Sequence, residues 1–298
     1  MTTRVIVNPA SAHGRTLQRA KALQPRLEAI FGALEWCVTR SAAEVTDVAR
    51  DSARQGHARL VVAGGDGTVH FAANGVAQTQ TALAVVPLGT GNDVATGVGL
   101  PTDAAAALEV LAAGHVRSID LGRVGDRVYV CVLGVGLDTP AIQLIDRVRI
   151  IPRSRLLYNY AALHSIVTYR PRTIRVTHAG GSREVPVAFA AVTNTESYAG
   201  GVRICPPARV DDGLLDLCVI DGLSWPRLLL RFGRVKAGRH GGMSGVLLTQ
   251  SPWVRFESRE RVPITLDGEL TNLTTPFETR VLPGALRILG APATGGGP

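Results

Sequence analysis

The first 120 residues alternate short apolar runs with amphipathic stretches, and this alternation constrains the fold more than any other feature. The apolar runs are of strand length and lie at 5–7, 36–38, 60–63 and 83–86. A repeated order of strand, loop and helix is typical of an open, mostly parallel sheet with helices on both faces. The sequence therefore predicts an α/β domain at the N-terminus.

Helical patterns and cap residues separate these runs. Residues 15–34 are helical in pattern, although Pro25 must kink or break that stretch. Ser41 with Glu44 fits a capping box that opens a helix to about residue 55, and 69–77 has room for one short helix. Thr102 or Asp103 can cap an alanine-rich helix that stops at residue 114.

After about residue 121 short β-type runs dominate, which predicts a second, β-rich domain. The runs lie at 127–133, 172–178, 183–192, 214–220, 254–257 and 262–266, and 179–182 suits a hairpin connection. We expect helices there only at 158–169 and 225–239, and we read Gly134-Val135-Gly136 as a turn. The expected domains are 1–121 and 122–282, with 283–293 packing back on the first domain.

Two glycine-rich loops follow predicted strands and precede predicted helices. They are Gly64-Gly65-Asp66-Gly67-Thr68 and Pro87-Leu88-Gly89-Thr90-Gly91-Asn92-Asp93, and Asn8-Pro9-Ala10-Ser11 follows the first strand in the same way. Glycines allow the backbone to approach a phosphate, and a helix N-terminus offers it amide donors. Asp66 would repel an anion unless a cation intervened, which favours a magnesium-bridged nucleotide. Ordinary glycine-rich turns remain the alternative.

Charge and cysteine content narrow the choice of partners. Acidic residues number 24 against 32 basic ones, and two segments, 147–183 and 222–256, contain arginines but no acid. Anionic lipid attracts such segments, and Leu156-Leu157-Tyr158 and Leu228-Leu229-Leu230 can add apolar contact. With 5% aromatic residues and no recognisable nucleic-acid motif, we expect no nucleic-acid partner, although a basic nucleic-acid-binding protein stays a minor alternative. The chain has four cysteines without a C-x-x-C pair, no signal peptide pattern and no apolar stretch of spanning length, so we expect a cytoplasmic protein.

Six motifs in this order resemble the diacylglycerol kinase catalytic family, in particular the soluble bacterial lipid kinases related to sphingosine and ceramide kinases. To the three loops they add Asp120-Leu121-Gly122, Asp211-Asp212-Gly213-Leu214-Leu215-Asp216 and Leu266-Asp267-Gly268-Glu269. The Gly-Gly-Asp-Gly-Thr element alone also fits NAD kinases. The resemblance implies an N-terminal domain like those of phosphofructokinase and NAD kinase, followed by a β-sandwich domain that takes the lipid.

The resemblance also implies the site residues, motif by motif. ATP contacts would come from Asn8, Pro9, Ala10, Ser11, Ala12, Thr39, Gly64, Gly65, Asp66, Gly67, Thr68, Val69, His70, Thr90, Gly91 and Asn92. The first loop departs from the family pattern, because its glycine is displaced to Gly14. A Mg²⁺ site would use the Asp212 carboxylate with the backbone carbonyls of Arg209 and Leu214, although a plain turn before a strand fits equally well. Asp66, Asp93 and Asp120 would form an acidic network near the catalytic magnesium.

The proton acceptor is implied to be Glu269, with Asp267 assisting. If the chain stays extended, these two carboxylates point to the same side, about 6–7 Å apart. A pair of this kind can divide the work of accepting a proton and orienting a hydroxyl. An Asp-Gly hairpin turn with an exposed glutamate is the other interpretation.

Together these features predict an ATP-dependent lipid kinase, with ATP as donor, Mg²⁺ as cofactor and diacylglycerol as the favoured acceptor. Phosphatidylglycerol, a sphingoid base or another lipid alcohol remain alternatives, and NAD kinase is a weaker one. We expect the protein to associate peripherally with an anionic membrane surface, and a homodimer is left open.

Overall fold

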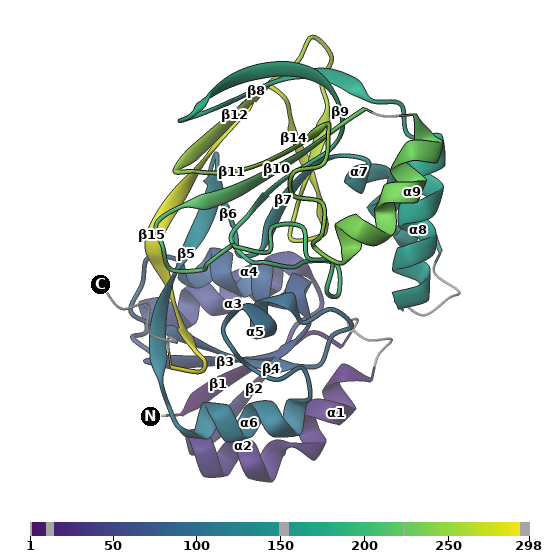
Figure 1. Ribbon diagram of the computed structural model, residues 1–298. Coiled ribbons are helices and arrows are strands. Elements are labelled where there is room, and N and C mark those ends of the chain that lie inside the picture. The colour runs from purple at the N-terminus through teal and green to yellow at the C-terminus, as the bar shows by residue number, and fades with distance from the viewer. Residues whose placement is uncertain (1, 10–14, 149–154, 223, 293–298) are drawn as a thin grey trace. The chain divides into compact units, whose positions relative to one another are not determined.

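The computed structural model describes residues 2–9, 15–148, 155–222 and 224–292. The chain forms two compact units (Figure 1). Unit 1 comprises Met1–Asp120 and Gly284–Pro298, and unit 2 comprises Leu121–Pro283. The chain passes from one unit to the other within strands β5 (Val116–Val124) and β15 (Phe277–Leu289).

Unit 1 contains the parallel sheet that the apolar runs predict. Its strands are β1 (Thr3–Val7), β2 (Leu34–Val38), β3 (Arg59–Gly64) and β4 (Ala82–Pro87). They pair in the order β2-β1-β3-β4, and β15 adds to β4 through Ile288 opposite Leu83, again in parallel. The apolar residues of β3 and β4 are fully buried, which explains why these strands read as continuous apolar runs.

The helices of unit 1 begin and end close to the predicted signals. They are α1 (Thr16–Ala22), α2 (Gln24–Phe31), α3 (Ala42–Arg54), α4 (Asp66–Val76), α5 (Asp93–Gly97) and α6 (Ala104–Ala112). Pro25 breaks the first stretch as expected and lies in the first turn of α2. The side chains of Ser41 and Asp103 accept hydrogen bonds from the backbone N–H groups of Glu44 and Ala106, so both predicted N-caps are present. The Glu44 carboxylate accepts from the N–H of Arg40, one residue before the position that a capping box uses.

Unit 2 is β-rich and mainly antiparallel. Besides parts of β5 and β15 it contains β6 (Arg127–Tyr129), β7 (Val132–Gly136), β8 (Arg172–His178), β9 (Gly181–Thr193), β10 (Leu215–Asp221), β11 (Val246–Ser251), β12 (Trp253–Glu257), β13 (Pro263–Leu266) and β14 (Glu269–Thr274). The order is β14-β13-β7-β9-β8-β12-β15, with β10 paired to both β9 and β11. The β8–β9 hairpin turns at residues 179–180, within the connection that the sequence predicts.

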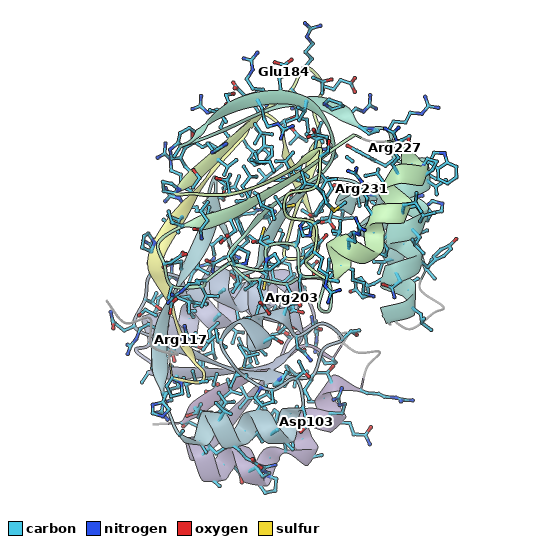
Figure 2. All side chains as sticks on the ribbon, in the orientation of Figure 1. Asp103, Arg117, Glu184, Arg203, Arg227 and Arg231 are labelled. Atoms are coloured by element: carbon cyan, nitrogen blue, oxygen red, sulfur yellow. The ribbon has the colours of Figure 1, made fainter. Side chains whose placement is uncertain are left out.

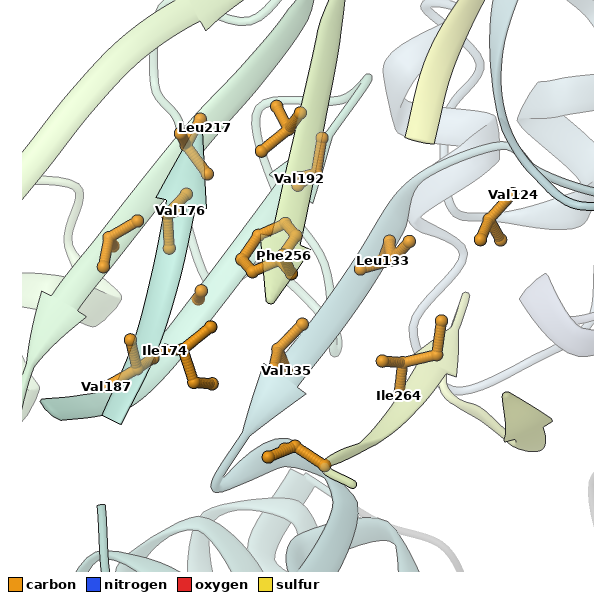
Figure 3. Close-up of a cluster of buried hydrophobic side chains, with 14 of the residues drawn as sticks. Val124, Leu133, Val135, Ile174, Val176, Val187, Val192, Leu217, Phe256 and Ile264 are labelled. Carbon is orange, nitrogen blue, oxygen red and sulfur yellow. The ribbon is translucent and has the colours of Figure 1, made fainter. Parts of the chain in front are cut away.

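A buried apolar cluster holds the strands of unit 2 together (Figure 3). Leu133, Val176, Val192 and Phe256 come from four different strands, and all four are fully buried. The ring of Phe256 also stacks on that of Phe277, with 5.0 Å between the centroids. This shared core fixes the position of β13, which leads into the Leu266–Glu269 motif.

Two of the predictions for the second half are wrong. The second half contains α8 (Arg155–Thr168) and α9 (Trp225–Lys236), which were expected, and also a third helix, α7 (Asp138–Arg147), which was not. Pro140 weakens the helical pattern of this segment, but it lies in the first turn of α7, where a missing N–H costs little.

The segment Gly134-Val135-Gly136 belongs to strand β7 and is not a turn. A Cβ on Gly134 would lie 2.4 Å from Asp138 Oδ2 and 2.6 Å from Thr265 Oγ1, so the glycine reflects close packing on the strand. Across the described parts of the chain, every helix is too short or too polar to cross a bilayer.

Candidate functional site

The predicted nucleotide loops of unit 1 leave one edge of its parallel sheet. The register sets Val7 opposite both Val38 and Ala63, and Gly64 opposite Pro87, so the four strands end level with one another. Carboxyl ends of parallel strands are where open α/β sheets bind ligands. The structure therefore brings together the described parts of the loops that the sequence singles out.

The two glycine loops touch through their backbones. A Cβ on Gly89 would lie 2.4 Å from the Cα of Gly65, which leaves no space for a side chain. The backbone N–H of Leu88 donates to the carbonyl of Gly64 at 2.9 Å. The glycines are thus needed for the approach of one loop to the other, which the sequence did not show.

Asp66 connects the first loop to helix α5. Its Oδ2 accepts from the backbone N–H of Asn92 at 2.8 Å, and its Oδ1 accepts from that of Val94 at 3.1 Å. These amides lie at the N-terminus of α5, where a carboxylate is favourable. The structure thus provides a local reason for an acid in this loop, and a bridging cation is not needed to explain it.

Asn92 shapes the second loop. It is buried and has a left-handed backbone, with a φ of 59°. Its side-chain oxygen accepts from the N–H of Gly89, and its amide nitrogen donates to the Gly89 carbonyl. These two hydrogen bonds join the ends of a tight turn that contains Thr90 and Gly91.

The other predicted ATP residues differ in accessibility. The side chains of Thr39, Thr68, Val69 and His70 are buried, and the Thr39 hydroxyl donates to the Val7 carbonyl at 3.3 Å. Thr90 is exposed, whereas Asn8, Pro9, Gly65, Gly67 and Gly91 are partly exposed. Ala10, Ser11 and Ala12 lie outside the described residues. Contacts from Val69 and His70 would accordingly have to come from the backbone.

Arg19 is a residue that the sequence analysis missed. It lies on α1, and its Nη1 donates to the carbonyl of Leu88 at 3.2 Å. A guanidinium there adds positive charge beside the second glycine loop. Helical spacing alone could not reveal this contact, because it joins residues 69 positions apart.

Asp93 and Asp120, expected in the acidic network, are both buried. Asp120 Oδ1 accepts from the backbone N–H of Gly284 at 2.7 Å. That bond joins β5 to β15 inside unit 1. A structural role for Asp120 is therefore present, and its link to a magnesium stays a prediction.

The Leu266–Glu269 motif is a tight hairpin, so the condition of an extended chain is not met and the Asp-Gly turn is the interpretation that is confirmed. Leu266 pairs with Glu269, and Asp267 and Gly268 both have positive φ, at 49° and 80°. Two such residues between antiparallel strands are typical of the turn that Asp-Gly favours. Asp267 and Glu269 are consequently not neighbours on one face of a strand.

Asp267 is buried and its carboxylate binds backbone amides. It accepts from the N–H groups of Val130, Cys131 and Val132 at 2.8, 2.7 and 2.9 Å. This interaction also explains why the apolar run at 127–133 divides into β6 and β7, because the amides between them turn toward the carboxylate. Asp267 thereby anchors the turn that leads to Glu269, the partly exposed first residue of β14.

The predicted magnesium residues precede β10. Asp212 Oδ1 accepts from the N–H of Leu214 at 3.1 Å, and its Oδ2 accepts from Gln250 Nε2 at 3.1 Å. The same amide nitrogen lies 3.4 Å from Asp216 Oδ2. Burial raises the pKa of Asp216 to about 6, with a smaller contribution from the Asp212 charge.

A carboxylate with backbone carbonyls suits a hard cation such as Mg²⁺. Among the residues described, no three histidine, cysteine, aspartate or glutamate side chains are arranged to hold a metal. A cation at Asp212 would therefore depend on carbonyl oxygens, as the sequence analysis expects of Arg209 and Leu214. These oxygen donors are of the kind that Mg²⁺ prefers.

Each half of the chain matches a known protein family domain. Residues 2–124 match the diacylglycerol kinase catalytic domain, and residues 131–290 match the YegS C-terminal NAD kinase beta sandwich-like domain. The chain is 32% identical to a protein of Chromohalobacter salexigens named "Probable lipid kinase YegS-like", over 86% of this chain and 83% of the relative. It is 31% identical to a diacylglycerol kinase of Mycobacterium tuberculosis, over 95% of this chain and 93% of the relative.

A solved structure shows the same fold. A diacylglycerol kinase from Bacillus anthracis aligns with a TM-score of 0.80 at 25% identity, covering 99% of this chain and 98% of the other. The match of the parallel α/β domain to the diacylglycerol kinase catalytic domain, together with the β sandwich-like domain that follows it, defines the class as a two-domain kinase. The protein belongs to the diacylglycerol kinase family of lipid kinases.

Proposed function

We propose that this protein transfers the γ-phosphate of ATP to the hydroxyl of a lipid, and that diacylglycerol is its acceptor. The observation that carries the proposal is the joined pair of glycine loops at the carboxyl edge of the unit 1 sheet. Membership of the lipid kinase family and the names of the relatives at about 31% identity support the acceptor.

Unit 1 would bind the triphosphate through backbone groups. Amides at the start of α4 precede its first helical bond, which runs from the N–H of Val69 to the carbonyl of Gly65. Helix-start amides and the positive end of the helix dipole attract phosphate. The guanidinium of Arg19, beside Leu88, would add charge at the same edge.

Magnesium is the cofactor that we assign to the reaction, where, when bound with the nucleotide, it would supply neutralisation of charge on the transferred phosphate. Asp212, with the carbonyls of Arg209 and Leu214, would hold a second, structural or regulatory ion. Asp66 would act near the nucleotide mainly by holding α5 in place, because two amides already bind its carboxylate.

Glu269 is the residue that we assign as proton acceptor. The lipid hydroxyl oxygen attacks the γ-phosphorus, the bond to the ADP oxygen breaks, and Glu269 accepts the hydroxyl proton. Asp267 would position Glu269 through the β13–β14 turn, since its own oxygens accept three amide protons. We place this reaction at the cytoplasmic surface of a membrane.

A panel of acceptors tests the proposal. The full-length protein is incubated with ATP, Mg²⁺ and, in separate samples, diacylglycerol, phosphatidylglycerol, sphingosine or NAD, and products are read by mass. We expect phosphatidic acid from diacylglycerol as the main product. Phosphorylation of another lipid alone would overturn the choice of acceptor, and phosphorylation of NAD alone would overturn the lipid kinase assignment.

A further inference from the structure

Helices α8 and α9 lie side by side at one edge of unit 2 (Figure 1). They are joined by a hydrogen bond of 3.0 Å from Lys236 Nζ to Asn159 Oδ1. Of the ten large apolar side chains exposed in the described parts of the chain, seven lie on these two helices. We call this region the α8–α9 surface.

Helix α8 exposes a continuous apolar stripe. Leu156, Tyr160, Leu163 and Val167 are 81%, 56%, 37% and 51% exposed. Their spacing of i, i+4, i+7 and i+11 places them on one face, at 100° per residue. Leu157, Ala161 and Ile166 are buried and hold the rest of the helix against the unit, so the exposed stripe is additional to the core.

Helix α9 has no buried residue along its twelve positions. Its partly buried residues, Leu228, Arg231, Phe232 and Val235, share one face. By helical geometry the opposite face is centred on Leu229 and Leu230, with Arg227 and Arg234 on one flank and Trp225 and Lys236 on the other. Apolar residues flanked by arginine, lysine and tryptophan are typical of a helix that lies in a membrane interface.

The charges of these helices have one sign. Neither 155–168 nor 225–236 contains an acidic residue, and α9 alone carries three arginines and one lysine. Figure 2 shows Arg227 and Arg231 on α9, and Arg231 turns inward to donate to the carbonyl of Ser244. An apolar surface with this charge is complementary to an anionic bilayer.

Three other arginines of the basic segments differ from those of α9 because they pair with acids of unit 2. Arg172, Arg175 and Arg183 form ion pairs with Glu260, Glu184 and Asp221, at 2.6, 2.8 and 2.8 Å. Their charge is offset locally, so they contribute little attraction for anionic lipid. Helix α9, by contrast, carries three arginines and one lysine with no acid on the same helix.

We propose that the α8–α9 surface docks the protein onto an anionic lipid bilayer. Leu156, Tyr160, Leu229 and Leu230 enter the interface, and Arg227, Arg234 and Lys236 contact the headgroups. The choice of a bilayer as occupant rests in part on the proposed lipid kinase function, because the substrate of such an enzyme is dissolved in a membrane. The exposed apolar stripe of α8 and the positive charge of α9 do not depend on that function.

Vesicle sedimentation without ATP tests this proposal. The wild-type protein should bind vesicles of phosphatidylglycerol and phosphatidylcholine and bind pure phosphatidylcholine much less. Replacing both Arg227 and Arg234 by alanine should lower the partition coefficient about 25-fold, since each basic residue contributes roughly fivefold. Leu156→Ser with Leu230→Ser should lower it about tenfold or more.

Matched controls separate docking from general effects. Arg259→Ala with Arg261→Ala removes equal charge from an exposed part of unit 2, and Val116→Ser removes an exposed apolar residue from unit 1. Both should bind anionic vesicles as the wild type does. Because all the changes are at exposed positions, circular dichroism and unfolding temperature should be unchanged.

Three results would overturn the proposal. They are equal binding to both kinds of vesicle, wild-type binding by the α8–α9 variants, or a soluble dimer that the double serine variant converts to a monomer. The last result would identify a second copy of the chain as the occupant. Failure of the kinase assignment would look different, because the protein would still bind vesicles but would phosphorylate no lipid. If the protein is an active kinase, the docking variants should phosphorylate a water-soluble short-chain diacylglycerol at the wild-type rate.

Discussion

Asp267 illustrates what a single side chain contributes to this protein. Its carboxylate is buried and binds three consecutive backbone amides that are more than 130 positions away in the chain. Hydrogen bonds to a charged acceptor are stronger than neutral ones, and an orphaned buried N–H is costly. The residue therefore fixes the β13–β14 turn that carries Glu269.

Asp267→Ala should lower the free energy of unfolding by about 3–5 kcal/mol, because three buried amides lose their acceptor. Urea unfolding of the full chain measures the change. Asp126→Ala, at an exposed turn position, serves as the control and should change it by no more than about 0.5 kcal/mol. An equally small effect of Asp267→Ala would show that the amides find other partners.

The sequence indicated the residues whose role depends on the conformation of their own stretch of backbone. It singled out the glycine loops and offered an Asp-Gly turn as one interpretation of 267–268. It did not show that Gly65 and Gly89 abut, that Arg19 reaches Leu88, or that Asp267 binds residues 130–132. Those contacts join distant parts of the chain, and no spacing rule encodes them.

At the scale of elements, the cap of α5 links local stability to ligand binding. Asp66 accepts from two amides at the start of α5, and Asp103 does the same for one amide of α6. Asp66→Ala and Asp103→Ala should each cost about 1 kcal/mol of stability, the usual effect of removing a cap. Calorimetric titration should show weaker ATP binding for Asp66→Ala alone.

Wild-type ATP affinities in both cap variants would contradict this assignment. They would mean that α5 and the second glycine loop do not bind the nucleotide. Weakened binding in both variants would instead indicate a general loss of order in unit 1.

The segment before β10 provides a second element-scale prediction, through its Mg²⁺ dependence. A ligand that binds the folded state at about 100 times its Kd stabilises it by about 2.7 kcal/mol. Adding Mg²⁺ should therefore raise the unfolding temperature of the wild type and of Asp211→Ala but not that of Asp212→Ala. The same rise in all three proteins would exclude Asp212 as a ligand.

The predictability of the elements follows from their burial. Strands β1, β3 and β4 are buried on both faces and read as apolar runs, so the sequence located them. Strand β14 has no buried residue, and the sequence of β15 contains Pro283 and Gly284, which weaken a strand pattern, so both were missed. Pairing with neighbouring strands, and not the local pattern, makes these segments strands.

At the scale of the whole molecule, the proposed reaction draws on both units. We propose that unit 1 supplies the phosphate-binding edge of a parallel sheet, and that unit 2 supplies the proton acceptor and the membrane-docking helices. The family assignment supports this division, since the catalytic and C-terminal family domains match the two halves of the chain. The order of motifs along the sequence was sufficient to predict the family, because six short motifs in a fixed order are far more specific than one.

The central claim is that Glu269 removes the proton of the attacking lipid hydroxyl, and Glu269→Gln tests it most directly. General-base catalysis contributes about 10²–10⁴ in rate, so kcat for phosphatidic acid formation should fall by about that factor while the Kd of ATP stays unchanged. Glu184→Gln, on the exposed side of β9, should keep both values. A folded Glu269→Gln protein with the wild-type kcat would contradict the account.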